Sequence, residues 1–193
     1  MGLQMNSSAT MAAEVLYQVH PDFEEVFASP SILIDALWRR GELLLGSNNN
    51  LRGEFFELLV ALALYKWDVR PFYYQAKLAL IPETDYDFAL WTQHGPVVLS
   101  VKTSLRERVK QAALEAVALR MVHRRAECYV LTLNHDEATN AQRKVERGDL
   151  PALSAVITAS TADFDVLIQR LASSNPTAAP TVPLIAHSRS VVT

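Results

Sequence analysis

The chain has 193 residues, of which half are hydrophobic and a fifth are charged, and its formal net charge is −3. These values predict one globular domain with a full core, and a polyanion would have to bind through a local basic patch. No apolar run is long enough to span a membrane, no secretory signal is visible, and the single cysteine, Cys128, excludes an internal disulfide framework. We therefore expect a cytoplasmic protein with no membrane contact.

Two helices are predicted in the N-terminal third of the chain. Ser29 and Pro30 make a helix start, with serine as the N-cap and proline at the first helical position, and Gly46 suits the end. Residues 1–46 are therefore expected to form a helical segment, which could supply dimer contacts. Leu51–Tyr65 is predicted to be a buried helix because it is apolar nearly all round. Glu57 lies deep in this helix, so its carboxylate has to be paired, hydrogen-bonded or bound to a metal ion, and an ion pair with an arginine is the purely structural alternative.

A strand and a β-hairpin follow the buried helix. Val69–Ile81 is rich in aromatic and β-branched residues, which favours a strand. The apolar runs Phe88–Trp91 and Val97–Val101 flank turn-forming residues at 92–96, and this pattern is typical of a hairpin.

The pairing of the hairpin decides which charged side chains meet. If Thr92 pairs with Val97 across a four-residue loop, Asp87 faces Lys102 on the neighbouring strand. A carboxylate and an ammonium would then lie together at the far end of the hairpin. A charged helix, Ser104–Arg125, is predicted to follow immediately.

The rest of the chain continues the alternation of strands and helices. We expect a strand at Tyr129–Leu133, a short helix at Asn140–Glu146, a short apolar run at Ala155–Ala159, a helix at Thr161–Ala172 and a loose tail at 173–193. Residues 47–172 would form the core of an α/β fold, a mixed β-sheet flanked by helices.

Asp87, a 12-residue gap and then Ser100-Val101-Lys102 resemble the PD-(D/E)xK nuclease motif. In that superfamily a strand aspartate and a (D/E)xK sequence on the next strand converge. The expected element order is similar to the superfamily core, and Gly53-x-x-x-Glu57 is similar to the glutamate-bearing helix that precedes the site in many members. This chain departs in two ways, because no proline precedes Asp87 and Ser100 replaces the acidic residue.

Glu115 can compensate for that replacement. It follows Lys102 with 12 residues between them, which resembles the SxK-x(12–13)-E variant of type II restriction endonucleases that cut CCGG-containing sites, and of their CCWGG-cutting relatives. In that group a glutamate on the following helix takes the place of the missing carboxylate. The resemblance implies a restriction-endonuclease-like fold and Mg²⁺-dependent cleavage of double-stranded DNA.

The resemblance also implies roles for individual residues. Asp87, Glu115, the Val101 carbonyl and Glu57 would hold Mg²⁺, which prefers carboxylate, carbonyl and water oxygens. Lys102 would orient the attacking water and stabilise the charge on the phosphate. Asp87, Lys102, Glu115 and Glu57 are thus the predicted catalytic residues.

The segment after the catalytic strand is predicted to contact DNA through Arg106, Glu107, Arg108, Lys110 and Gln111. Arginine reads guanine bidentately and glutamate accepts from the cytosine amino group, so we expect a G·C-containing target. A palindromic target needs two sites, which favours a homodimer, and a DNA methyltransferase could act separately as the cognate partner.

Two other interpretations stay open. The chain could be a repair or junction-resolving nuclease of the same fold. It could instead be a catalytically silent DNA-binding protein, which Ser100 favours and the spacing of Glu115 disfavours.

Overall fold

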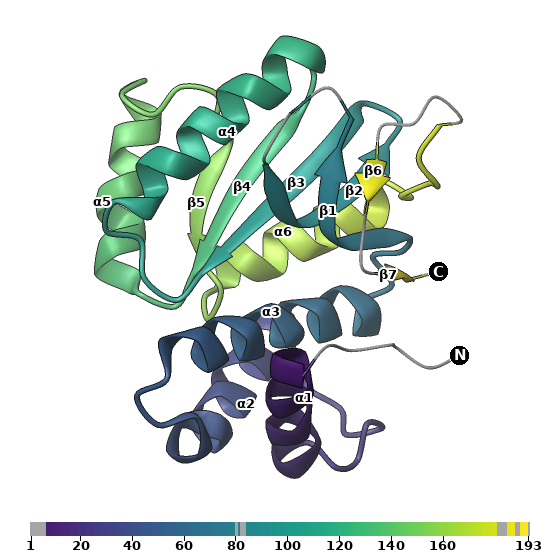
Figure 1. Ribbon diagram of the computed structural model, residues 1–193, viewed down its shortest axis with the longest axis vertical. Helices are drawn as coiled ribbons and strands as arrows, with labels where there is room; N and C mark the ends of the chain where they lie inside the picture. The colour runs from purple at the N-terminus through teal and green to yellow at the C-terminus, as the bar shows by residue number, and fades with distance from the viewer. Residues whose placement is uncertain (1–6, 80, 82–83, 181–184, 188–189, 193) are drawn as a thin grey trace.

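A mixed β-sheet lies between two layers of helices in the computed structural model, which describes residues 7–79, 81, 84–180, 185–187 and 190–192 (Figure 1). The helices are α1 (Ser7–Val19), α2 (Pro30–Leu45), α3 (Asn49–Lys66), α4 (Arg108–Val122), α5 (His135–Glu146) and α6 (Ala162–Ser173). The strands are β1 (Phe72–Leu78), β2 (Asp85–Thr92), β3 (Gly95–Lys102), β4 (Glu127–Thr132), β5 (Ala155–Thr158), β6 (Ile185–His187) and β7 (Ser190–Val192). The predicted mixed sheet flanked by helices is confirmed. None of the helices in the described part is long and apolar enough to cross a membrane.

The predicted boundaries of α2 are confirmed. The Ser29 hydroxyl accepts a hydrogen bond from the Ile32 N–H, and Pro30 is the first helical residue. The helix ends at Leu45, and Gly46 follows with a φ of 52°, a conformation that glycine adopts without strain.

The strand order across the sheet is β5-β4-β3-β2-β1-β6, and β7 also pairs with β1. Strands β1, β2 and β3 are antiparallel neighbours, whereas β3, β4 and β5 run parallel through the connecting helices α4 and α5. The expectation of a loose tail does not hold for β6 and β7, because both pair with β1.

The hairpin between β2 and β3 is tighter than expected. Thr92 pairs with Gly95, not with Val97, so only Gln93 and His94 form the loop. Gly95 has a φ of 132°, which a side chain would disfavour. The predicted register is therefore wrong by two positions. A shift of two preserves the face of every side chain, so residues expected to meet become diagonal neighbours.

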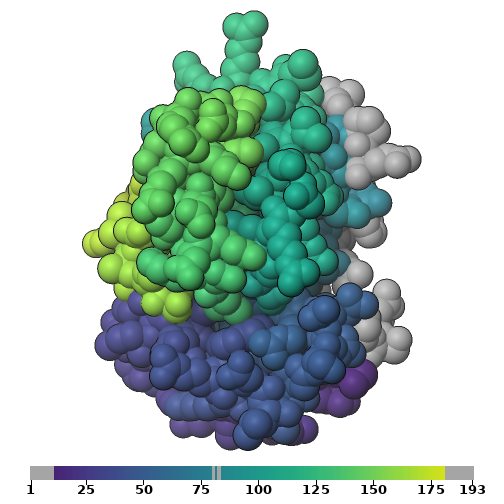
Figure 2. Space-filling view, turned by 90° about the vertical axis from the view of Figure 1, so that its left-hand side faces the viewer, coloured from purple at the N-terminus to yellow at the C-terminus, as the bar shows by residue number. Residues whose placement is uncertain are grey.

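Each face of the sheet has its own apolar core. On one face α3 and α6 cover the strands, and α1 and α2 pack beneath α3, with Phe55, Phe56, Phe72, Phe88 and Leu131 among the fully buried side chains. On the other face α4 and α5 cover Ala76, Val98, Cys128, Val130 and Val156. Figure 2 shows the N-terminal helices, purple to blue, directly below the teal and green residues of α4 and α5. The buried position of α3 and of Cys128 agrees with the sequence.

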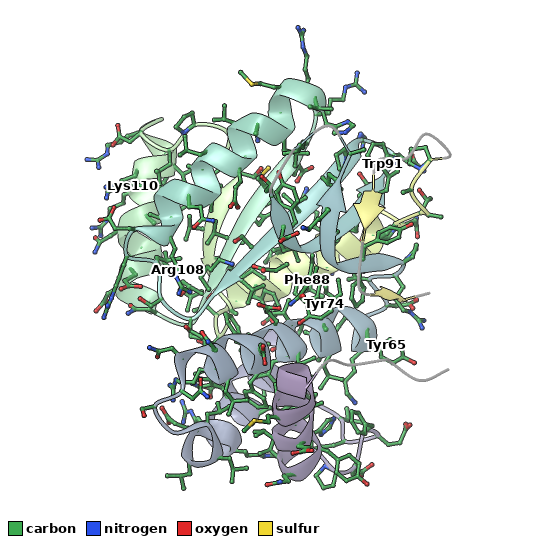
Figure 3. All side chains as sticks on the ribbon, viewed as in Figure 1. Tyr65, Tyr74, Phe88, Trp91, Arg108 and Lys110 are labelled. Carbon is green, nitrogen blue, oxygen red and sulfur yellow. The ribbon has the colours of Figure 1, made fainter. Side chains whose placement is uncertain are left out.

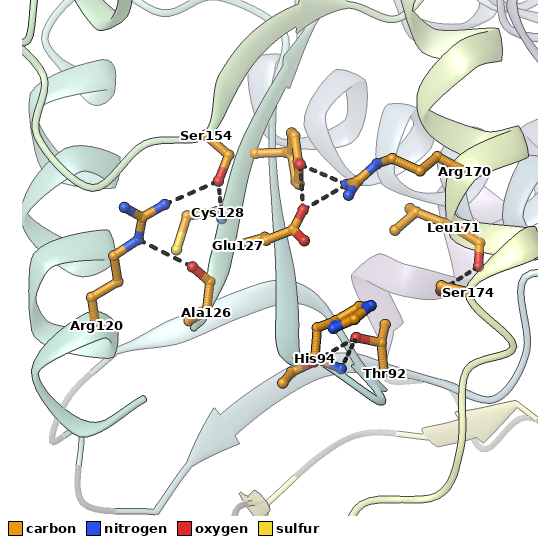
Figure 4. Close-up of polar contacts among 12 residues, drawn as sticks. Thr92, His94, Arg120, Ala126, Glu127, Cys128, Ser154, Arg170, Leu171 and Ser174 are labelled. Carbon is orange, nitrogen blue, oxygen red and sulfur yellow. Dashed lines mark hydrogen bonds and ion pairs between the residues drawn. The ribbon is translucent and has the colours of Figure 1, made fainter. Parts of the chain in front are cut away.

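The amino end of β4 is tied to the helices on both faces (Figure 4). Arg170 of α6 donates a 2.6 Å hydrogen bond to Glu127. On the opposite side Arg120 of α4 donates to the Ala126 carbonyl and to the Ser154 hydroxyl. These contacts fix the end of the parallel strands that lies away from Lys102.

Helix α4 begins at Arg108, four residues after the predicted start at Ser104. The Glu137 carboxylate of α5 accepts hydrogen bonds from the Leu105 N–H at 2.6 Å and from the Ser104 hydroxyl at 3.2 Å. Arg106 has a φ of 33°, outside the α-helical range. The segment between β3 and α4 is therefore a turn anchored by Glu137, and not the first turn of a helix.

Candidate active site

Asp87 lies where β2 and β3 separate. The ladder between these strands ends at the pair Phe88 and Leu99. Beyond it, Oδ2 of Asp87 accepts a 2.6 Å hydrogen bond from the Val101 N–H and a 2.7 Å hydrogen bond from Lys102 Nζ. The Asp87 side chain is 14% exposed and that of Lys102 is 23% exposed. The predicted contact between Asp87 and Lys102 is therefore present, although the register of β2 and β3 differs from the predicted one.

At the level of Asp87, strands β1 and β2 change the face of the sheet to which alternate side chains point. A regular strand puts residues i and i+2 on the same face, yet Tyr74 packs on the α3 side and Ala76 on the α4 side. Phe88 and Tyr86 of β2 divide in the same way. The change in β1 falls at Gln75, whose φ is 49°. A non-glycine residue in this conformation is strained, and such strain is concentrated at functional sites.

Glu57 reaches this point from α3. Its Oε2 accepts a 2.8 Å hydrogen bond from the Tyr74 hydroxyl and a 3.1 Å hydrogen bond from the Gln75 amide. Among the described residues, the recorded hydrogen bonds of the Glu57 carboxylate thus come from Tyr74 and Gln75 and not from an arginine. Burial, together with the negative charge of Asp87, raises the pKa of Glu57 to about 7. Figure 3 labels Tyr74 and Phe88 between the sheet and α3, the helix that carries Glu57.

Glu115 approaches from the opposite helical layer. It lies on α4, partly buried, and its Oε1 accepts a 2.8 Å hydrogen bond from Gln111. Burial raises the pKa of the Glu115 carboxyl, with Asp87 acting in the same direction and Lys102 against it. Because the charges of Asp87 and Lys102 act on both glutamates, the four predicted catalytic residues belong to one electrostatic cluster.

The predicted DNA-contacting residues are exposed around the start of α4. Arg106 and Glu107 lie in the turn before the helix, and Arg108 is its first residue. Glu107 accepts a 2.7 Å hydrogen bond from Lys110, which lowers the pKa of the Glu107 carboxyl. Figure 3 labels Arg108 and Lys110 in this region. The structure therefore puts this exposed segment directly after Lys102.

The cluster contains carboxylates that could bind a metal ion, but they are not arranged as a complete set of ligands. Within the part of the chain that the structure describes, no three His, Cys, Asp or Glu side chains are grouped closely enough to hold an ion. The Lys102 ammonium occupies Oδ2 of Asp87 instead.

Three residues of the site escaped sequence analysis. Tyr74 and Gln75 hold Glu57, and Glu137 anchors the turn before α4. The polar residue Gln75 within an otherwise aromatic strand was a signal in the sequence for Tyr74 and Gln75, although it did not indicate that Glu57 is their partner. Nothing near Leu105 in the sequence indicated Glu137.

Two solved structures, both of restriction endonucleases, have this architecture. One is a complex of the restriction endonuclease PspGI with its substrate DNA, matched with a TM-score of 0.57 at 13% identity over 92% of this chain and 84% of that chain. The other is the type IIP restriction endonuclease Kpn2I, with a TM-score of 0.50 at 15% identity over 89% of this chain and 74% of that chain. No protein-family model and no curated protein matches the sequence. The chain therefore has the restriction-endonuclease-like fold, and its activity has to be argued from its own residues.

Proposed function

We propose that this protein is a Mg²⁺-dependent endonuclease that hydrolyses double-stranded DNA at a short specific sequence, as a type II restriction endonuclease does. The observation that carries the proposal is the partly buried Asp87–Lys102 pair, 2.7 Å apart, with Glu57 and Glu115 acting on it from two helices. The fold shared with two restriction endonucleases supports the same activity.

The residues present fit Mg²⁺ by their chemistry. Asp87, Glu57 and Glu115 supply carboxylates, and the Val101 backbone lies beside Asp87, where its carbonyl could add a ligand. Burial, and to a smaller extent the like charge of Asp87, raises the pKa of both glutamates, and a cation bound by them would relieve that cost. Binding requires the carboxylates to move closer together than in the free chain. The ion would polarise the phosphate and lower the pKa of the attacking water.

The protein side chains then have separate tasks. The Val101 N–H holds the Asp87 carboxylate in place, and Asp87 orients the Lys102 ammonium. Lys102 would position the attacking water and stabilise the negative charge that develops on the phosphate. Tyr74 and Gln75 would keep the Glu57 carboxylate directed at the same point.

Sequence recognition is assigned to the exposed turn after Lys102. Arg106 and Arg108 can read guanine bidentately, which favours a G·C-containing target. Glu107 already accepts from Lys110 in the free protein, so it must exchange that partner for a cytosine amino group. Gln111 holds Glu115 and would couple this segment to the catalytic cluster.

A homodimer fits the proposal, because one subunit carries one cluster and a palindrome needs two. The N-terminal segment is the proposed source of the dimer contacts. Its helices α1 and α2 expose large apolar side chains, with Tyr17 64% exposed and Leu43 94% exposed. A separate DNA methyltransferase would protect the host sites.

Incubation with phage DNA and Mg²⁺ tests the proposal directly. Discrete bands are the expected result, whereas a smear would mean a nuclease without sequence specificity, such as a repair enzyme of the same fold. Intact DNA at every metal concentration would contradict cleavage.

A catalytically silent DNA-binding protein is the second candidate. The replacement of the acidic motif residue by Ser100, and the absence of a finished carboxylate cage among the described residues, favour it. Specific binding of one fragment in Mg²⁺, without cleavage, would identify this case.

A further inference from the structure

Two glycines lie inside helices of the N-terminal layer, Gly41 in α2 and Gly53 in α3. Glycine inside a helix destabilises it relative to alanine, because the unfolded chain loses more freedom on folding. Packing explains Gly41. A Cβ atom added there would lie 2.8 Å from two ring carbons of Phe55, so the close contact between α2 and α3 needs glycine.

Nothing comparable explains Gly53. Apart from its two chain neighbours and the adjacent backbone of α3, a Cβ atom added at this position would meet no atom of the described residues within 4 Å. Its backbone is that of an ordinary α-helix, which alanine adopts more readily. Neither packing nor backbone conformation therefore requires glycine here, and the open space beside it lies outside the protein's own core.

The location of Gly53 relates this space to the catalytic cluster. Gly53 precedes Glu57 by four residues, so both lie on the same face of α3. Side chains on a helix lean toward its N-terminus, which directs Glu57 over the turn that contains Gly53. The charges of Asp87 and Lys102 act on the same Glu57 carboxyl. A molecule held at the cluster therefore passes close to Gly53.

We propose that Gly53 leaves room for the sugar–phosphate backbone of the DNA strand held at Asp87 and Lys102. This inference rests on the proposed function, and it adds α3 to the DNA-binding surface as the part that the strand approaches most closely. Glycine permits such an approach because it carries no side chain. A side chain at this position would displace the strand, and a displacement of about 1 Å can reduce catalysis about 100-fold.

The test compares wild-type protein with Gly53→Ala, Gly53→Leu and the matched control Gly41→Ala. Thermal unfolding, retention of end-labelled phage DNA fragments in Ca²⁺ and cleavage in Mg²⁺ are measured for each. Gly53→Ala should raise the unfolding midpoint by about 2–4 °C, since alanine favours the helix. Both Gly53 variants should bind DNA more weakly, and Gly53→Leu should cut about 100-fold more slowly or worse. Gly41→Ala should unfold at a lower temperature and bind DNA like wild type.

The outcomes separate this inference from the proposed function. Wild-type binding and cleavage by Gly53→Leu would overturn the inference and leave the nuclease assignment standing. If wild type binds the fragments without cutting them and Gly53→Leu loses that binding, the inference stands and the nuclease assignment fails. Wild-type protein that neither binds nor cuts would overturn both.

Discussion

Lys102 and Asp87 are joined by a 2.7 Å hydrogen bond in a setting that an ordinary surface salt bridge does not have. One strand away, Lys77 and Asp85 form a comparable cross-strand pair at 3.5 Å, but their side chains are 50% and 62% exposed. Exposed pairs of that kind add little to stability. The Lys102–Asp87 pair is mostly buried, and its charges act on two glutamates whose pKa values are raised, an arrangement that suits a reaction better than it suits the stability of the fold.

The raised pKa of Glu57 predicts a pH-dependent cost to folding. Its carboxyl has a pKa of about 7 in the folded chain against 4.5 when free, chiefly because of burial. Between pH 4.5 and about 7 the Glu57 carboxyl is ionised in the unfolded chain but still protonated in the folded chain. The free energy of unfolding should therefore fall as pH rises through this range. The loss is at most about 3 kcal/mol.

Urea unfolding of wild type and Glu57→Gln, without divalent cations, measures this cost. The free energy of unfolding of the variant should rise relative to that of wild type as pH increases from 5 to 8, because glutamine does not ionise. A difference between the two proteins that stays constant with pH would mean that the Glu57 carboxylate is well solvated.

Features determined by local chemistry were predictable from the sequence. The start of α2 follows from Ser29 and Pro30, and the burial of α3 follows from its uniformly apolar composition. The Asp87–Lys102 contact was predicted from the pairing of the hairpin, and because side chains alternate between the faces of a strand, a register error of two positions left both residues on the same face. The length of the hairpin loop was misjudged because any of several residues at 92–96 could turn the chain.

Features that depend on distant partners were not predictable. The start of α4 is set by Glu137, 32 residues from Leu105, so helical spacing alone placed the boundary too early. The partners of Glu57 come from β1, where Gln75 adopts a φ of 49° that no local pattern indicated. Both cases require the sheet to be assembled before the contact exists.

Removal of Glu115 tests whether it replaces the missing motif acid. Glu115→Ala should lose Mg²⁺-dependent cleavage, because the Ser100 hydroxyl carries no negative charge. Adding Ser100→Glu to that variant should restore part of the activity by returning a carboxylate to β3. Full cleavage by Glu115→Ala would remove it from the mechanism, and Gln111→Ala, which frees Glu115 without deleting it, serves as the milder comparison.

Recognition and backbone binding should separate within the segment that begins α4. Arg108→Ala should relax one position of the target at a cost of about 1–3 kcal/mol, because a bidentate contact to guanine is lost. Lys110→Ala should weaken binding to all duplexes alike and reduce the salt dependence. Binding to cognate and one-base-altered duplexes, in Ca²⁺ at two salt concentrations, distinguishes the two. Equal losses for both duplexes with Arg108→Ala would make this residue a phosphate contact.

Glu137 should act on recognition through the turn that it anchors. Glu137→Ala frees the Leu105 N–H and the Ser104 hydroxyl, so the turn that carries Arg106 should lose its fixed position. We expect discrimination between cognate and altered duplexes to fall, with Glu137→Gln recovering part of it because its amide oxygen can still accept. Unchanged discrimination by Glu137→Ala would show that the turn needs no anchor.

The central claim is that Lys102 and Asp87 perform the cleavage, and a comparison of Lys102→Met with Lys77→Met tests it most directly. Both substitutions remove the lysine of a cross-strand pair with aspartate, but only Lys102 lies in the cluster. Single-turnover cleavage of phage DNA in Mg²⁺ should fall at least about 100-fold for Lys102→Met and stay near wild type for Lys77→Met. Both variants should remain folded and retain DNA binding, although Lys102→Met should unfold at a lower temperature than Lys77→Met because it leaves the Asp87 carboxylate without its ion-pair partner. Cleavage by folded Lys102→Met at the wild-type rate would contradict the account.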